Sequence, residues 1–220
     1  MMAPLSFPDT PELRREVLDA CLTMSALKLC ISTWGNISVR IHGGILVTPS
    51  RMEYGSMTAD DLVVTDAAGQ RIAGTRLPSS ETLLHCALQR ERPELPVWIH
   101  THPRCLSTLA CRRRGMPVFV EDMAQIVGGA VNCTEYVPGG RHRELAEAAV
   151  AALAPDSAAV LLANHGVIVG GTSLREALAA TEVLEKAAAI WLAGEDSVVP
   201  IPEELVREER NRYLYKYGKE

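Results

Sequence analysis

Short turns between patterned stretches constrain the fold of this chain more than any other feature. Residues 35–41 alternate apolar and polar side chains, Gly43 and Gly44 interrupt the pattern, and residues 45–47 resume it. Two further pairs of stretches are separated by similarly short turns: 62–65 with 71–74, and 158–163 with 167–169. A short turn joins antiparallel strands, whereas parallel strands need a crossover of about a dozen residues. The sequence therefore predicts a largely antiparallel sheet.

Helical patterns lie between these hairpins. A helix is predicted from about Pro11 to Cys30, because Thr10 can cap it, proline suits its first position and apolar residues recur at helical spacing. Further helices are predicted at about 81–91, 104–113, 143–152 and 173–192, with a charged helix at the C-terminus, and further strands at 97–102, 118–120 and 135–137. The pattern indicates one α/β domain that covers residues 1–220.

Composition excludes several classes of protein. The 220 residues carry a formal net charge of -5, with 47% hydrophobic and 22% charged residues, which is typical of a globular protein and argues against a nucleic-acid partner. No apolar stretch approaches the ~20 residues of a membrane span, and the N-terminus has no secretory pattern, so we expect a cytoplasmic protein with no membrane partner. The six cysteines form no CxxC pair and are expected to be free, buried thiols.

Three histidines are candidate metal ligands. His100 and His102 lie two apart in a predicted strand, so alternation places both side chains on one face. Pro103 ends that strand, and we expect the pair at an edge of the sheet that a substrate can reach. His165 follows another apolar strand, in a turn with Gly166. Three imidazoles can supply the protein ligands of an open zinc site, whereas the pair alone is equally well explained as half-buried, hydrogen-bonded histidines.

Glu81 is the candidate base, and it opens the helix predicted at 81–91. A carboxylate there can also simply complement the helix dipole. Ser79 and Ser80 precede it and offer hydroxyl and backbone N–H groups at a helix N-terminus, a favourable place for a phosphate, although N-capping explains one serine equally well. His85 shares the helix face of Glu81, and a structural role is favoured for it.

Five short motifs together resemble one known family. They are Gly35-Asn36-Ile37-Ser38, Thr48-Pro49-Ser50, Leu77-Pro78-Ser79-Ser80-Glu81, His100-Thr101-His102-Pro103 and Asn164-His165-Gly166. Their order and spacing resemble the class II aldolase/adducin family over essentially the whole chain. The resemblance implies a three-layer α/β/α sandwich around a mixed, largely antiparallel sheet. It also implies a homotetramer with active sites between subunits.

The same resemblance implies roles for particular residues. His100, His102 and His165 would bind Zn²⁺ or another divalent transition metal, and Glu81 would approach the metal when no substrate is bound and act as the base. The implied phosphate site comprises Gly35, Asn36, Ser50, Ser79 and Ser80. Tyr217 would close over the site from a tail that is expected to be mobile from about residue 205. The implied reaction is reversible cleavage of a ketose 1-phosphate into dihydroxyacetone phosphate and an aldehyde, through a zinc-stabilised enediolate.

Two positions depart from the family pattern. Arg51 stands where the phosphate loop usually has glycine, so it either narrows the anion pocket or contacts a phosphate or carboxylate itself. Asp122 stands where a proton-donating tyrosine is expected, and it becomes a candidate for handling the aldehyde oxygen. These departures make decarboxylation of a 3-oxo acid phosphate a competing hypothesis. A non-catalytic interaction domain, as in adducin, is a third.

Overall fold

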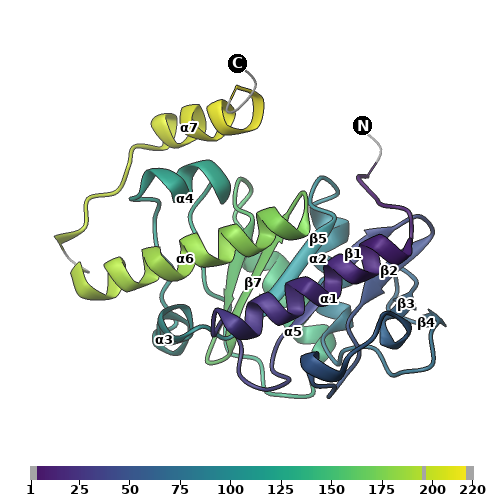
Figure 1. Cartoon of the computed structure of the whole chain (residues 1–220). Coiled ribbons are helices and arrows are strands. Elements are labelled where there is room, and N and C mark those ends of the chain that lie inside the picture. The colour runs from purple at the N-terminus through teal and green to yellow at the C-terminus, as the bar shows by residue number, and fades with distance from the viewer. Residues whose placement is uncertain (1–3, 195–196, 217–220) are drawn as a thin grey trace.

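The computed structural model describes residues 4–194 and 197–216, and within them it forms an antiparallel sheet flanked by helices (Figure 1). The helices are α1 (Pro11–Ala26), α2 (Thr82–Glu91), α3 (Arg104–Arg112), α4 (Glu121–Ile126), α5 (His142–Ala152), α6 (Leu174–Gly194) and α7 (Glu203–Tyr215). The strands are β1 (Asn36–Ile41), β2 (Gly44–Val47), β3 (Val63–Thr65), β4 (Arg71–Ala73), β5 (Val97–Thr101), β6 (Ala159–Leu162) and β7 (Gly166–Gly171).

The seven strands are ordered β4-β3-β2-β1-β5-β7-β6, and each pairs antiparallel with its neighbours. The prediction of an antiparallel α/β fold is confirmed. The expected mixture of strand directions is wrong, because every strand pair in the described residues is antiparallel, and parallel pairing among them is confined to isolated bridges at Phe7 and Cys133. Strand β5 therefore lies in the interior of the sheet, between β1 and β7.

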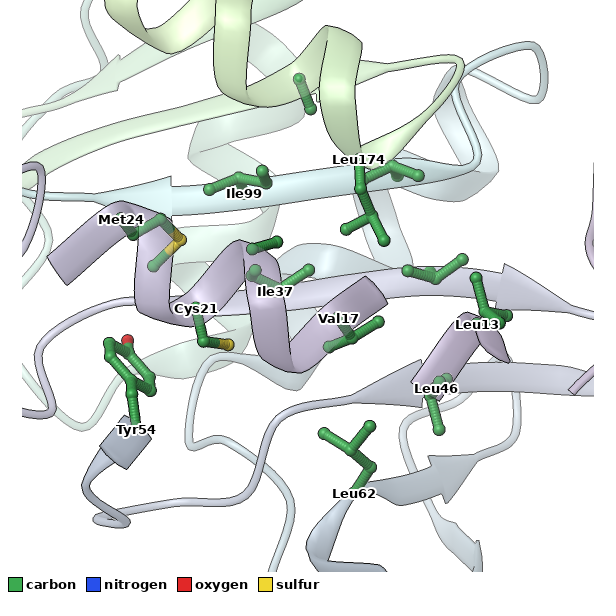
Figure 2. Close-up of a cluster of buried hydrophobic side chains, with 14 of the residues drawn as sticks. Leu13, Val17, Cys21, Met24, Ile37, Leu46, Tyr54, Leu62, Ile99 and Leu174 are labelled. Carbon is green, nitrogen blue, oxygen red and sulfur yellow. The ribbon is translucent and has the colours of Figure 1, made fainter. Parts of the chain in front are cut away.

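Apolar side chains on both faces of the sheet pack against helices. On one face, Ile37 and Ile99 are fully buried under Val17 and neighbouring residues of α1, as Figure 2 shows. On the other face, Trp98 is fully buried in a cluster with residues of α2 and α5, among them Leu84. Alternation along β5 sends consecutive side chains to opposite faces. Strand β5 is thus buried on both faces, and only its ends are free to carry polar chemistry.

Helix α1 begins as its sequence predicts and ends earlier. Thr10 accepts a hydrogen bond from the N–H of Leu13, and Pro11 occupies the first position. The helix ends at Ala26 instead of Cys30, because Lys28 adopts a left-handed backbone (φ 57°) that interrupts helical hydrogen bonding. Because the helix ends early, residues 29–35 are not helical and connect it to the start of β1.

Two predicted strands do not form in the described chain. Residues 135–137 are irregular, because the preceding residues form the hydrogen bonds to the edge strand β6 instead. The N–H of Thr134 donates to the carbonyl of Leu161, and the N–H of Leu161 donates to the carbonyl of Asn132. Residues 118–120 are also irregular, and the carbonyl of Val118 accepts from Ile201. The sequence reading also missed the short helix α4 that follows.

The C-terminal helix packs on this α4 helix. The guanidinium of Arg210 donates to the carbonyls of Gln125 and Ile126, and Val206 is buried. The helical part of the expected tail is therefore attached to the rest of the chain. Among the described helices, none has both the length and the apolar character needed to cross a membrane. Cys21, Cys30 and Cys86 are free and buried as expected, whereas Cys111 is exposed and the remaining two are half-buried.

Candidate metal centre

The carboxyl end of β5 carries the first two candidate ligands. His100 is its fourth residue, and His102 follows the strand, separated from α3 only by Pro103. Their Nε2 atoms lie 2.8 Å apart and their ring centroids 4.6 Å apart. The pair lies where the strand ends, as Pro103 predicts, although β5 is an interior strand of the sheet. His102 is half-buried there, whereas His100 is buried.

His165 joins them from the turn between β6 and β7. Its ring centroid lies 4.8 Å from the centroids of both other histidines. Asn164 gives this turn a left-handed backbone (φ 56°), and Gly166 lets it approach β5 closely. A Cβ atom at Gly166 would lie 2.4 Å from the carbonyl oxygen of Thr101 and 2.6 Å from Cδ2 of His102. The asparagine and the glycine of this motif thus both serve the placement of the histidine rings.

The three imidazoles are suited to binding a metal ion. One ligand atom from each histidine can be chosen so that all lie within 4.8 Å of one another. His100 donates its Nδ1 proton to the carbonyl of Val167, which leaves the Nε2 lone pair facing the other rings. Burial lowers the pKa of His102 to about 3 and that of His165 to about 4, and the neighbouring imidazoles add to both shifts. Neutral imidazoles are the form that binds zinc.

Glu81 lies against the same rings. It occupies the N-cap of α2, one residue before the first helical turn, and its carboxylate oxygens lie 3.3 Å from Nε2 of His100 and 3.3 Å from Nε2 of His165. The amide of Asn36 donates to this carboxylate over 2.8 Å. Burial alone raises the pKa of Glu81, but the two imidazoles and the Asn36 amide outweigh it and lower the pKa below its usual value. The carboxylate is therefore ionised at neutral pH.

A cavity of about 310 Å³ opens beside this cluster, and every residue of the predicted metal and phosphate sites lines it. Its lining comprises Thr33, Trp34, Gly35, Asn36, Pro49, Ser50, Arg51, Ser79, Ser80, Glu81, His100, His102 and His165. Ser50 and Ser79 are held together by backbone bonds across the loops: Ser50 N–H to the carbonyl of Leu77, and Ser79 N–H to that of Thr48. Segments far apart in the chain thus form one polar wall.

Arg51 has an unusual backbone on that wall. It adopts a left-handed conformation (φ 59°), which costs an L-residue roughly 1–2 kcal/mol and which glycine adopts freely. Its exposed side chain lines the cavity beside Ser50. Strained backbone of this kind is often found at binding sites.

The structure does not bring Asp122 to the metal centre of its own chain. Asp122 lies on α4 and pairs with Lys186 of α6, in a separate hollow with Val120, Glu121, Gln125 and Arg212. Tyr217 lies outside the described residues. Sequence reasoning also missed two residues that line the cavity, Thr33 and Trp34, although they directly precede the Gly-Asn motif. The exposed indole of Trp34 lies 6.3 Å, centroid to centroid, from the ring of His102.

Comparisons with known proteins agree with this geometry. The family model of the class II aldolase and adducin N-terminal domain matches residues 15–192. The chain is 35% identical to a 5-methylthioribulose-1-phosphate/5-deoxyribulose-1-phosphate aldolase of Rhodospirillum rubrum, over 93% of this chain and 90% of that one. It is 32% identical to the L-fuculose phosphate aldolase of Escherichia coli K12, over 87% of each. A solved structure of L-fuculose 1-phosphate aldolase superposes with a TM-score of 0.88 at 29% identity, covering 94% of this chain and 99% of that one.

Proposed function

We propose, because this chain belongs to the class II aldolase and adducin family, that it is a metal-dependent lyase acting on a sugar phosphate. The proposed reaction is reversible cleavage of a ketose 1-phosphate into dihydroxyacetone phosphate and an aldehyde. The observation that carries the proposal is the convergence of three imidazoles and the Glu81 carboxylate at one cavity. The names of the two relatives described above, both aldolases of sugar phosphates, support it.

His100, His102 and His165 would hold the metal, and neutral nitrogen ligands of this number suit Zn²⁺ with a position left open for substrate. Other divalent transition metals also accept such ligands. When bound, the ion supplies positive charge that stabilises the negative charge developing on the substrate oxygens. Glu81 would act as the base that moves the proton in the reaction, and its ionised state and its distance of 3.3 Å from two ligand nitrogens support this role.

The phosphate group is proposed to bind at Ser50, Ser79 and Ser80, with the backbone of Gly35 and the charge of Arg51 nearby. Asn36 is restricted in this role. Its amide oxygen is used by His85 and one N–H by Glu81, so its second N–H alone remains for a phosphate oxygen. Asn36 therefore contributes more to holding the base than to holding the anion.

The aldehyde end is proposed to be served by Asp122 and Tyr217. Asp122 lies outside the cavity of its own chain, and a homotetramer with active sites between subunits would allow a neighbouring copy to supply it. We also propose that residues 1–220 form a single domain, that the helices on both faces make a three-layer α/β/α sandwich, and that the protein acts in the cytoplasm.

Substitution of Glu81 by glutamine tests the proposal. The amide keeps the size of the side chain but cannot accept a proton, so Glu81→Gln should retain zinc and lose about 100-fold or more of the cleavage rate. Zinc content and release of dihydroxyacetone phosphate are measured on the same preparation. Glu53→Gln, an exposed carboxylate away from the cavity, is the matched control. Near-normal turnover of Glu81→Gln would reject Glu81 as the base.

Decarboxylation of a 3-oxo acid phosphate is the second candidate, and the presence of Arg51 in the cavity favours it because a guanidinium binds a carboxylate well. Release of carbon dioxide from such an acid, with no cleavage of any ketose phosphate, would select this reaction. A protein that retains no divalent metal after purification would instead support a non-catalytic interaction domain.

A further inference from the structure

A row of buried polar side chains runs between α2 and β1, behind the metal centre. Glu81, His85 and Gln89 are spaced four residues apart and share one side of α2, while Asn36 and Ser38 are spaced two apart on β1. His85 and Ser38 are fully buried, and Gln89 and Asn36 are nearly so. Polar groups at such depth are costly unless they bond to one another.

These side chains form one continuous chain of hydrogen bonds. Gln89 Nε2 lies 2.8 Å from Ser38 Oγ, which lies 2.8 Å from His85 Nδ1. His85 Nε2 lies 2.5 Å from Asn36 Oδ1, and Asn36 Nδ2 lies 2.8 Å from the carboxylate of Glu81. The far end of the chain is therefore linked to the proposed base.

The carboxylate determines the direction of every bond in the chain. An ionised carboxylate accepts only, so Asn36 must turn its NH₂ group to Glu81 and its oxygen to His85. A neutral His85 ring must then donate from Nε2 and accept at Nδ1, where the Ser38 hydroxyl donates. Gln89 in turn donates to Ser38. Reversing any member would place two acceptors or two donors face to face.

We propose that His85 is a positioning residue for the reaction, held as the neutral Nε2–H tautomer so that Asn36 keeps Glu81 in its active orientation. This inference rests on the proposed function of Glu81. His85 does not line the cavity, and it acts through Asn36 without touching the substrate. A purely structural histidine would fill the same space, but its replacement would change stability and leave turnover by the folded enzyme unchanged.

The tautomer of His85 can be measured independently of any substrate. In the zinc-loaded protein with ¹⁵N-labelled histidine, the signal that disappears in His85→Gln belongs to His85. Its nitrogen shifts should show a protonated Nε2 and an unprotonated Nδ1. An Nδ1–H tautomer, or a charged ring at neutral pH, would overturn the proposal. This result stands whether or not the protein cleaves a ketose phosphate, so a wrong proposed function is distinguished from a wrong role for His85.

Kinetics test the positioning role. His85→Leu removes the donor to Asn36 and should lower kcat about 10-fold or more with zinc content unchanged, as losses of outer-shell partners commonly do. His85→Gln can still donate to Asn36 and should restore most of the rate. Ser38→Ala leaves the histidine in place and should lower kcat, but less than His85→Leu does. It replaces His85→Leu in the test if that variant does not fold. Thr181→Val removes a buried hydroxyl on α6 and is the matched control with unchanged kcat. Normal kcat in folded His85→Leu, or in folded Ser38→Ala where His85→Leu does not fold, would refute the inference.

Discussion

The Nε2 atoms of His100 and His102 lie 2.8 Å apart, and His165 faces both rings. Two imidazole nitrogens this close share either a proton or a cation, and only a cation could bind all three rings at once. We therefore expect zinc to stabilise the folded state, by about 3 kcal/mol when the free ion is at about a hundred times its Kd.

His165→Ala should abolish this stabilisation. The measurement is the free energy of unfolding with added zinc and with a chelator, for the wild type and the variant. His142→Ala, which removes a half-buried imidazole at the start of α5, should respond to zinc as the wild type does. Equal zinc stabilisation of His165→Ala and wild type would mean that the ion binds elsewhere.

Arg51→Gly should affect the stability of the protein and its binding of substrate in different ways. Glycine removes the cost of the left-handed backbone, so the free energy of unfolding should stay equal or rise by up to about 1 kcal/mol. The loss of a guanidinium from the cavity should raise KM for a phosphorylated substrate about 10-fold. Urea denaturation and initial rates measure the two effects. An unchanged KM in this variant would show that the Arg51 side chain does not contact the phosphate and only narrows the anion pocket.

Gly166→Ala should damage the metal centre through a backbone contact. The added methyl group would meet the Thr101 carbonyl and the His102 ring, so the β5–β7 pairing must shift and carry His102 with it. We expect a loss of about 1–3 kcal/mol in stability and at least a 10-fold weaker zinc affinity. Gly139→Ala is the control, since its methyl group would meet nothing within 4 Å. Wild-type zinc affinity in Gly166→Ala would contradict this account.

The metal centre could be predicted because its residues end strands. Local patterns identify a strand end without knowledge of the tertiary fold, and His100, His102 and His165 each follow an apolar stretch. The antiparallel sheet was predictable for a similar reason, since short turns permit few alternatives.

Features that depend on how elements pack could not be predicted in this way. The helix spacing of Glu81 and His85 is visible in the sequence, but their link through Asn36 depends on α2 lying across β1. The strand expected at 135–137 fails because residues 132–134 meet the edge of β6 first, and local propensity does not show which segment arrives at an edge. Asp122 was placed by family resemblance alone, and the structure pairs it with Lys186 outside the cavity.

Acid should destabilise the metal-free protein through His85. Burial lowers its pKa from 6.5 to about 3, with the nearby imidazole of His100 adding to the shift. Below pH 6.5 the unfolded chain therefore binds a proton that the folded chain does not, and stability falls as pH falls. His85 should contribute a loss of roughly 1 kcal/mol per pH unit between about pH 6 and pH 3. The pKa values of His102 and His165 are lowered as well, but both histidines are present in the wild type and in His85→Gln, so they do not cause a difference between the two. Urea denaturation from pH 7 to pH 4 should show a shallower pH dependence for His85→Gln than for wild type, and parallel curves would mean that His85 is protonated in the folded state.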